Sequence, residues 1–149
     1  MLKSIFSTII LLFISMTFVF SQSQLETLKT KEDAKKMSKE VISLFKDSKI
    51  KEAVEKMSPY WPISPAEMAT FQEKTEGYMD LLGNTYGAVI GTEKIQQEKI
   101  SDFALRETYV MLYQKSAIRL IFTYYKNKQG WTINSFKWDE NYEELFQKE

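Results

Sequence analysis

Four carboxylates lie close together in the chain and are the first candidates for acid–base chemistry. They are Glu93, Glu98, Asp102 and Glu107, which fall on or beside two segments with the alternating pattern of strands. Two carboxylates that share a cavity have perturbed pKa values and can act as acid and base. Lys94 and Lys99 each follow one of these acids, and such alternating charge is typical of a solvated strand edge. The solvated edge is the favoured interpretation.

A second group of side chains is suited to holding a ligand. Its members are Tyr86, Arg106, Tyr109, Arg119, Tyr125 and Trp138. An arginine on a partly covered sheet face can hold a carboxylate through two hydrogen bonds, and tyrosine hydroxyls can contact a ligand in a cavity. The arginines can equally cover apolar neighbours or pair with an acid, and the tyrosines can belong to the core. This group is the predicted ligand-binding site, and no residue is singled out as catalytic.

The composition excludes several classes of function. The chain has 149 residues without cysteine or histidine, and its 20 basic and 20 acidic residues give a formal net charge of zero. Disulfides, thiolate or imidazole metal sites, cysteine nucleophiles and serine–histidine triads are therefore excluded. We predict no metal and no cofactor. The neutral balance also argues against nucleic acid or an anionic membrane as a partner.

The N-terminal segment has the layout of a secretory signal. One lysine, Lys3, precedes an apolar run from Ile5 to Phe20 that ends in small polar residues. This pattern predicts a signal peptide over residues 1–23, cleaved before Gln22 or Gln24, and an exported protein that is periplasmic or secreted. An uncleaved membrane anchor is the alternative, because the run approaches the length that spans a bilayer. Residues 24–149 then form one domain without contact with the membrane.

Helical spacing of apolar residues predicts three helices before residue 86. Thr30 begins the first, which runs to about Lys46, and a short second helix covers 50–57. The third starts at the capping box Ser64–Glu67 with Pro65 in the first position, and ends at Gly83. Gly77 within it either permits close packing on a sheet or costs about 1 kcal/mol.

The segment between the second and third helices, SPYWPIS, places Trp61 between two prolines. A rigid loop of this kind can present its ring to a peptide or a sugar. More often the ring covers one end of the core, and this structural interpretation is favoured.

From Tyr86 onward the apolar period becomes two, which predicts strands over 88–100, 103–114, 117–126 and 131–139. A turn at Lys115–Ser116 would pair Tyr113 with Ile118 and place Glu107 and Tyr109 on an apolar face. Arg106, Arg119 and Tyr125 would share the opposite, mixed face. The expected fold is α+β: three N-terminal helices packed on a curved four-stranded antiparallel sheet, a cone-shaped roll.

The last strand contains two sets of apolar residues with opposite parity, Trp131 with Ile133 and Phe136 with Trp138. A four-residue turn would place the first pair on the core face, and a three-residue turn would place the second pair there. A bulge near Asn134 would return both pairs to the core. Without that bulge, a terminal helix at 142–146, a second subunit or a ligand must cover one tryptophan.

The order of elements, with SPYWPISPAEM, YGAVIGTEKI and RLIFTYYKNKQGWTINSFKWDENYEELF, resembles the nuclear transport factor 2-like (cystatin-like) superfamily. Within it the chain looks like small secreted bacterial proteins of unassigned function, over roughly Lys31 to Phe146. The resemblance implies a cone-shaped domain that is either a binding module or a small-molecule enzyme, and it transfers no catalytic residue. The leading hypothesis is a secreted, non-catalytic domain that binds a small molecule or a partner protein through the mouth of the cone or the exposed sheet face. The alternatives are an isomerase, dehydratase or hydrolase that uses tyrosine and carboxylate groups, and a homodimerisation module.

Overall fold

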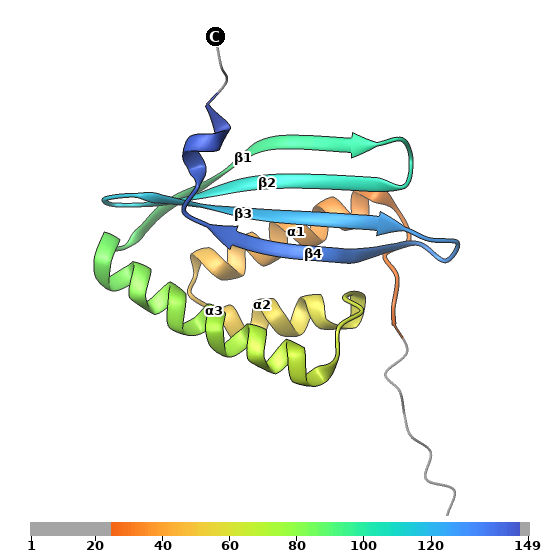
Figure 1. Ribbon diagram of the computed structural model, residues 1–149, viewed down its shortest axis with the longest axis horizontal. Helices are drawn as coiled ribbons and strands as arrows, with labels where there is room; N and C mark the ends of the chain where they lie inside the picture. Colours follow the sequence, from red (N-terminus) through yellow and green to blue (C-terminus); the bar gives the residue numbers. More distant parts are fainter. Residues whose placement is uncertain (1–24, 147–149) are drawn as a thin grey trace, which may run out of the picture.

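Three helices and then four strands follow one another along the chain, which confirms the predicted α+β class (Figure 1). The computed structural model describes residues 25–146, and the predicted signal sequence lies outside them. The helices are α1 (Lys31–Lys46), α2 (Ile50–Met57) and α3 (Pro65–Tyr86), and the strands are β1 (Val89–Ile100), β2 (Ala104–Tyr113), β3 (Ala117–Lys126) and β4 (Trp131–Asp139). Short 3-10 turns occupy η1 (Ser58–Tyr60) and η2 (Tyr142–Leu145). Within the described part of the chain, every helix is too short or too polar to cross a bilayer.

Both predicted N-terminal caps are present. At α1 the amide of Asp33 donates to Thr30 Oγ1 (3.1 Å), and the amide of Thr30 donates to Asp33 Oδ2 (2.9 Å). At α3 the amide of Glu67 donates to Ser64 Oγ (3.2 Å), and the amide of Ser64 donates to Glu67 Oε2 (2.8 Å). These reciprocal bonds satisfy backbone donors that no helical carbonyl can reach.

The predicted end of the third helix was wrong. Helix α3 continues through Gly83 to Tyr86 and is capped by Gly87, whose φ of 85° favours glycine. The extra turn places the ring of Tyr86 against Tyr113, with 6.3 Å between centroids, and this contact offsets the cost of an internal glycine. A Cβ at Gly77 would meet no atom within 4 Å, so close packing does not explain that glycine.

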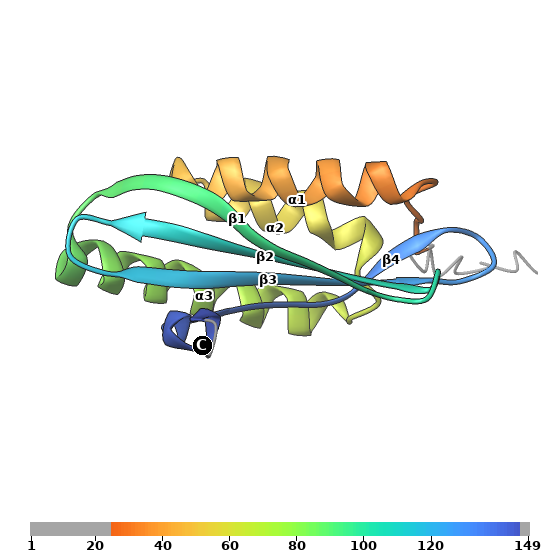
Figure 2. The same cartoon turned by 90° about the horizontal axis from the view of Figure 1, so that it is seen from above.

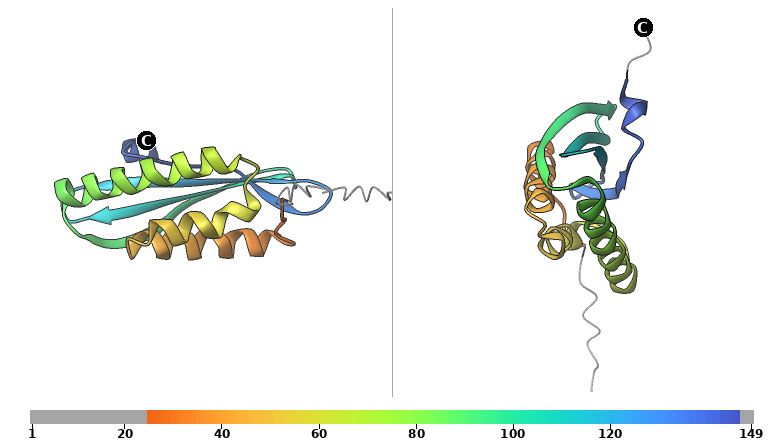
Figure 3. Two further views of the ribbon diagram at one scale, coloured as in Figure 1. Left: turned by 90° about the horizontal axis from the view of Figure 1, so that it is seen from below. Right: turned by 90° about the vertical axis from the view of Figure 1, so that its left-hand side faces the viewer.

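The strands form one antiparallel sheet in the order β1-β2-β3-β4, with the three helices gathered on one of its sides (Figure 1). Figure 2 shows that β1, at one edge, bows over its length. In the end-on view of Figure 3, η2 lies on the other side of the sheet from α1. The sheet therefore has an inner face covered by helices and an outer face that, within residues 25–146, is covered in part by η2.

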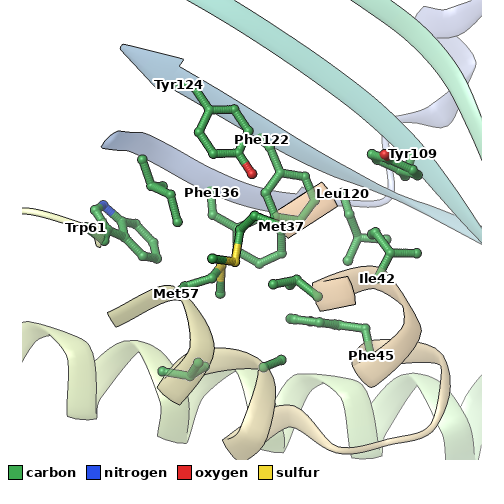
Figure 4. Close-up of a cluster of buried hydrophobic side chains, with 14 of the residues drawn as sticks. Met37, Ile42, Phe45, Met57, Trp61, Tyr109, Leu120, Phe122, Tyr124 and Phe136 are labelled. Carbon is green, nitrogen blue, oxygen red and sulfur yellow. The ribbon is translucent and has the colours of Figure 1, made fainter. Parts of the chain in front are cut away.

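The core lies between the inner face and the helices (Figure 4). Phe136 of β4 is at its centre, with ring centroids 5.3 Å from Phe45, 5.9 Å from Phe71 and 4.6 Å from Phe122. Apolar residues recur every second position in the strands and on one side of each helix, so their burial joins the two layers.

The predicted register of β2 with β3 was wrong by two residues, although its faces were correct. The turn occupies Gln114–Lys115, because the amide of Tyr113 donates to the carbonyl of Ser116 (2.8 Å). Leu112 consequently pairs with Ala117, and Tyr109 with Leu120. Parity survives a shift of two residues, since side chains alternate with a period of two.

The four-residue turn before β4 and the bulge within β4 are both present. Lys126 pairs with Trp131 and Tyr124 with Ile133, and after an irregularity at Asn134 Thr123 pairs with Ser135. The extra residue resets the alternation, so Ile133 and Phe136 are both buried. Trp131 and Trp138 both lie on the inner face. Neither tryptophan therefore needs a cover on the outer face.

We expect deletion of Asn134 to preserve the fold. Without it, residues 131–139 read as a regular alternating strand whose inner and outer sets are unchanged. Deletion of Lys137 from the same strand is the control, because it moves Trp138 to the outer face and Asp139 to the inner one. Urea unfolding should show the first variant close to the parent and the second strongly destabilised. Equal losses would contradict the role given to the bulge.

Candidate functional site

The structure divides the six predicted ligand-binding residues among three places. Arg106, Arg119 and Tyr125 lie on the outer face of the sheet, as predicted from their parity. Tyr86 and Trp138 lie where α3 meets the end of β4. Tyr109 lies inside, on the inner face of β2. They therefore do not form one site.

The outer face holds an open groove of about 560 Å³ across all four strands, which we call the outer groove. Its walls contain five neutral side chains that can donate or accept hydrogen bonds: Gln96, Thr108, Thr123, Asn134 and Ser135. Within residues 25–146, none of these five side chains forms a hydrogen bond with the protein. Tyr125 lies two residues beyond Thr123 on the same face and is 47% exposed.

Arg119 lies at the end of the outer groove that η2 covers. Its Nε and Nη2 donate to Asp139 Oδ1 and Oδ2 (2.8 and 3.0 Å), and its Nη1 donates to Glu144 Oε2 (2.9 Å). The two-point pairing fixes the guanidinium plane, and Glu144 holds η2 against the sheet. Of the predicted roles, pairing with protein acids is the one that the geometry shows.

Both arginines of the outer groove are paired with carboxylates, whereas Lys137, in the same wall, has no ion pair within residues 25–146. Hydrogen bonds from Arg119 and from the Asn141 amide outweigh the effect of burial and hold the pKa of Asp139 below its ordinary value. Across the groove, Arg106 Nη1 lies 3.7 Å from Glu98 Oε2, and both side chains are about half exposed. These carboxylates are engaged by arginines, so they are poor candidates for an acid or a base.

Tyr86 and Trp138 belong to a contact that fastens β4 to α3. The indole Nε1 of Trp138 donates to Thr75 Oγ1 (3.1 Å), and its ring stacks on Tyr78 with 4.2 Å between centroids. The hydroxyls of Tyr86 and Tyr78 donate to Glu140 Oε1 and Oε2 (2.6 and 2.7 Å). The hydrogen bond from Tyr86, which has the larger effect, and the one from Tyr78 lower the pKa of Glu140. The partners of both predicted residues are protein groups.

On the inner side of the sheet, towards α1, lies a group of polar residues that we call the inner cluster: Ser38, Lys94, Glu107, Tyr109 and Tyr124. Glu107 is fully buried, and its Oε1 forms an ion pair with the ammonium of Lys94, which reaches in from edge strand β1. The hydroxyls of Tyr124 and Ser38 are hydrogen-bonded at 2.8 Å, joining β3 to α1. Figure 4 shows Tyr109 and Tyr124 above the apolar core.

Two polar atoms of the inner cluster have no hydrogen-bond partner in residues 25–146. They are Glu107 Oε2 and the Tyr109 hydroxyl oxygen, and both are buried. Burial, and then the charge of Glu107, raise the pKa of Tyr109. A carboxylate beside a protonated phenol can remove and return a proton. Neither residue, however, lines any of the five hollows found on the surface of residues 25–146.

The four carboxylates considered first have different surroundings. Glu93, Glu98 and Asp102 are exposed, which confirms the solvated-edge interpretation for them, whereas Glu107 is buried. The signal for Glu107 was its position on the apolar face of β2. No pattern pointed to Ser38 or to the inward direction of Lys94. In the part of the chain that the structure describes, no group of three or more carboxylates could hold a metal ion.

Trp61 has the structural role that was favoured. The residue is buried, and its ring packs edge-on against Phe71 with 5.1 Å between centroids. It therefore closes one end of the core between α2 and α3, as expected for a large apolar ring in a rigid loop.

We expect the free energy of unfolding to fall in alkaline solution while the buried tyrosines of the folded protein are still protonated. Burial raises the pKa of Tyr113 to about 12, and burial with the Glu140 hydrogen bond raises that of Tyr78 to about 12. Tyrosines of the unfolded chain lose their protons near pH 10. Above that pH the unfolded state binds fewer protons, so the free energy of unfolding falls as the pH rises from about 10 to 12.

Urea unfolding at neutral pH and at about pH 11 measures this loss. The Tyr113→Phe variant should lose less stability between the two conditions, since it removes one of these phenols. Unchanged stability of the parent across that interval would contradict the assignment.

Comparison of the chain with protein-family models, curated proteins and solved structures found no match in any of the three. The resemblance to nuclear transport factor 2-like domains therefore remains a prediction.

Proposed function

We propose that the protein is a non-catalytic binding domain whose outer groove holds a small polar molecule through hydrogen bonds. The observation that supports this most is the set of five neutral side chains in the groove whose polar atoms are not used within the described chain. A ligand that offers several hydroxyl, amide or carbonyl groups could satisfy them together. Tyr125, exposed nearby, offers an aromatic ring for the apolar side of such a ligand.

The paired charges around the outer groove support binding rather than catalysis. Arg119 is held by Asp139 and Glu144, so it presents a fixed frame for a ligand and keeps two N–H donors in reserve. We further propose that this domain is exported, and that its sheet and helices form the cone-shaped roll of the resembled superfamily. These two proposals rest on the leader pattern and on the order of elements.

Thermal unfolding of residues 24–149 with a panel of sugars, polyols, amino acids and carboxylates tests the proposal. A ligand present at about 100 times its Kd stabilises the folded state by about 2.7 kcal/mol. The double variant Thr108→Val/Thr123→Val removes two hydroxyls from the groove at nearly constant volume and should abolish the ligand-induced shift. Thr70→Val, on the exposed surface of α3, is the matched control. A panel without any shift would count against the groove as a binding site.

The second candidate is a small-molecule isomerase, dehydratase or hydrolase centred on the inner cluster. The unpartnered oxygen of buried Glu107 beside Tyr109 favours it, since buried carboxylates of this kind serve as bases in enzymes. Such an enzyme must open a path past Lys94. Activity that disappears in Glu107→Gln and Tyr109→Phe, with melting temperatures retained, would establish it.

Light scattering of the same preparations tests the remaining alternative, a homodimer. A single monomeric mass at high concentration would exclude it.

A further inference from the structure

A hollow of about 240 Å³ lies at the end of the sheet, away from the outer groove. Four lysines stand in its wall: Lys29, Lys31, Lys99 and Lys126. They come from the chain entering α1, the end of β1 and the end of β3. Figure 1 shows these segments at one end of the molecule, where the β1–β2 and β3–β4 turns both lie. We call this feature the lysine hollow.

The backbone around the lysine hollow is tied together by hydrogen bonds. The amide of Leu28 donates to the carbonyl of Trp131 (2.9 Å), and the amide of Trp131 donates to the carbonyl of Leu28 (2.8 Å). The amide of Lys126 donates to the carbonyl of Phe103 (2.8 Å). The segments that carry the lysines are thus held in place before any ligand arrives, which reduces the entropy lost on binding.

The charge of the lysine hollow is not balanced by its neighbours. None of its four lysines lies within 4.0 Å of a carboxylate in residues 25–146. Among the described residues, Asp102 is the one carboxylate in the wall. The whole chain has a formal net charge of zero, so this excess of positive charge is a local feature that composition does not predict.

We propose that the lysine hollow binds a small anion that carries phosphate groups. Ammonium groups on flexible stems are compact point charges, and several of them can gather around the oxygens of one phosphate. The hydroxyl of Ser101, also in the wall, adds a donor that makes no hydrogen bond within residues 25–146. The hollow has room for a diphosphate or a phosphorylated small molecule, and a lipid headgroup would present the same chemistry. The proposal is independent of the outer groove.

The test uses pyrophosphate as the probe, with calorimetry and thermal unfolding of residues 24–149 at constant ionic strength. Lys99→Gln/Lys126→Gln removes two charges from the hollow. Lys39→Gln/Lys115→Gln removes two exposed charges elsewhere and is the control with the same net charge. The first pair should weaken binding at least about tenfold, roughly the effect of losing one charge-assisted hydrogen bond. The control pair should bind as the parent does.

A second arm distinguishes the source of the phosphate. Vesicles of neutral phosphatidylcholine, with and without phosphatidylglycerol, are sedimented with the parent and with both double variants. Binding of pyrophosphate alone supports a soluble ligand. Binding of the phosphatidylglycerol vesicles alone, lost in Lys99→Gln/Lys126→Gln, supports a headgroup. Two results would overturn the proposal. One is an equal loss of binding in both double variants. The other is that neither probe gives a larger signal than sodium chloride at the same ionic strength.

Discussion

Replacement of Lys94 by methionine is expected to destabilise the protein by about 3 kcal/mol. The substitution keeps an apolar stem of similar length but leaves the fully buried carboxylate of Glu107 without its positive partner. Breaking a buried ion pair costs about 3–5 kcal/mol, and the lower end applies because water already reaches the Lys94 side chain, which is 30% exposed. Urea unfolding at neutral pH measures the loss.

The double variant Lys94→Met/Glu107→Leu separates the pair from the packing. Because it removes both charges, it should regain most of the lost stability. Lys115→Met, in the exposed β2–β3 turn, should change the free energy of unfolding by less than about 0.5 kcal/mol. If Lys94→Met behaved like Lys115→Met, the ion pair would make no net contribution to the free energy of unfolding.

Replacement of Phe136 by alanine should be at least as damaging, with a loss of about 3–5 kcal/mol. The Phe136 ring is 4% exposed and lies among Phe45, Phe71 and Phe122, which come from two helices and a strand. Its removal leaves a cavity between the two layers that rigid neighbours cannot fill. A loss of this size is a large part of the 5–15 kcal/mol that stabilises an ordinary domain.

Phe103→Ala is the matched control for this prediction. Phe103 is 46% exposed, and in the described part of the chain its ring contacts that of Tyr125, edge-on at 6.5 Å. The same change of side chain should therefore cost about 1 kcal/mol or less. Similar losses in the two variants would mean that Phe136 does not occupy the centre of the core.

Most of the secondary structure could be predicted because local interactions decide it. The caps at Thr30 and Ser64 satisfy backbone donors within one turn, and the predicted bounds of the first two helices are confirmed. The end of α3 was missed because two glycines, Gly83 and Gly87, can both terminate a helix. The packing of Tyr86 on Tyr113, far away in the chain, favours the second.

The candidate site was predictable in part. Parity alone placed Arg106, Arg119 and Tyr125 together on the outer face. Parity could not show that Asp139 and Glu144 hold Arg119, because the turn into η2 brings Glu144 back over the sheet. The lysine hollow was equally hidden, since its residues come from three segments that meet only in the folded chain.

The sequence by itself determined the α+β class, the positions of seven helices and strands, and the inner and outer faces of β2 and β3. These features depend on periodicity and capping, which act within a few residues. The tertiary structure alone decided the register of the strands and the bulge at Asn134, which places both pairs of apolar residues in β4 on the inner face. Burial of Ile133 and Phe136 against the same helices stabilises the bulge, and that energy exists only after the layers have met.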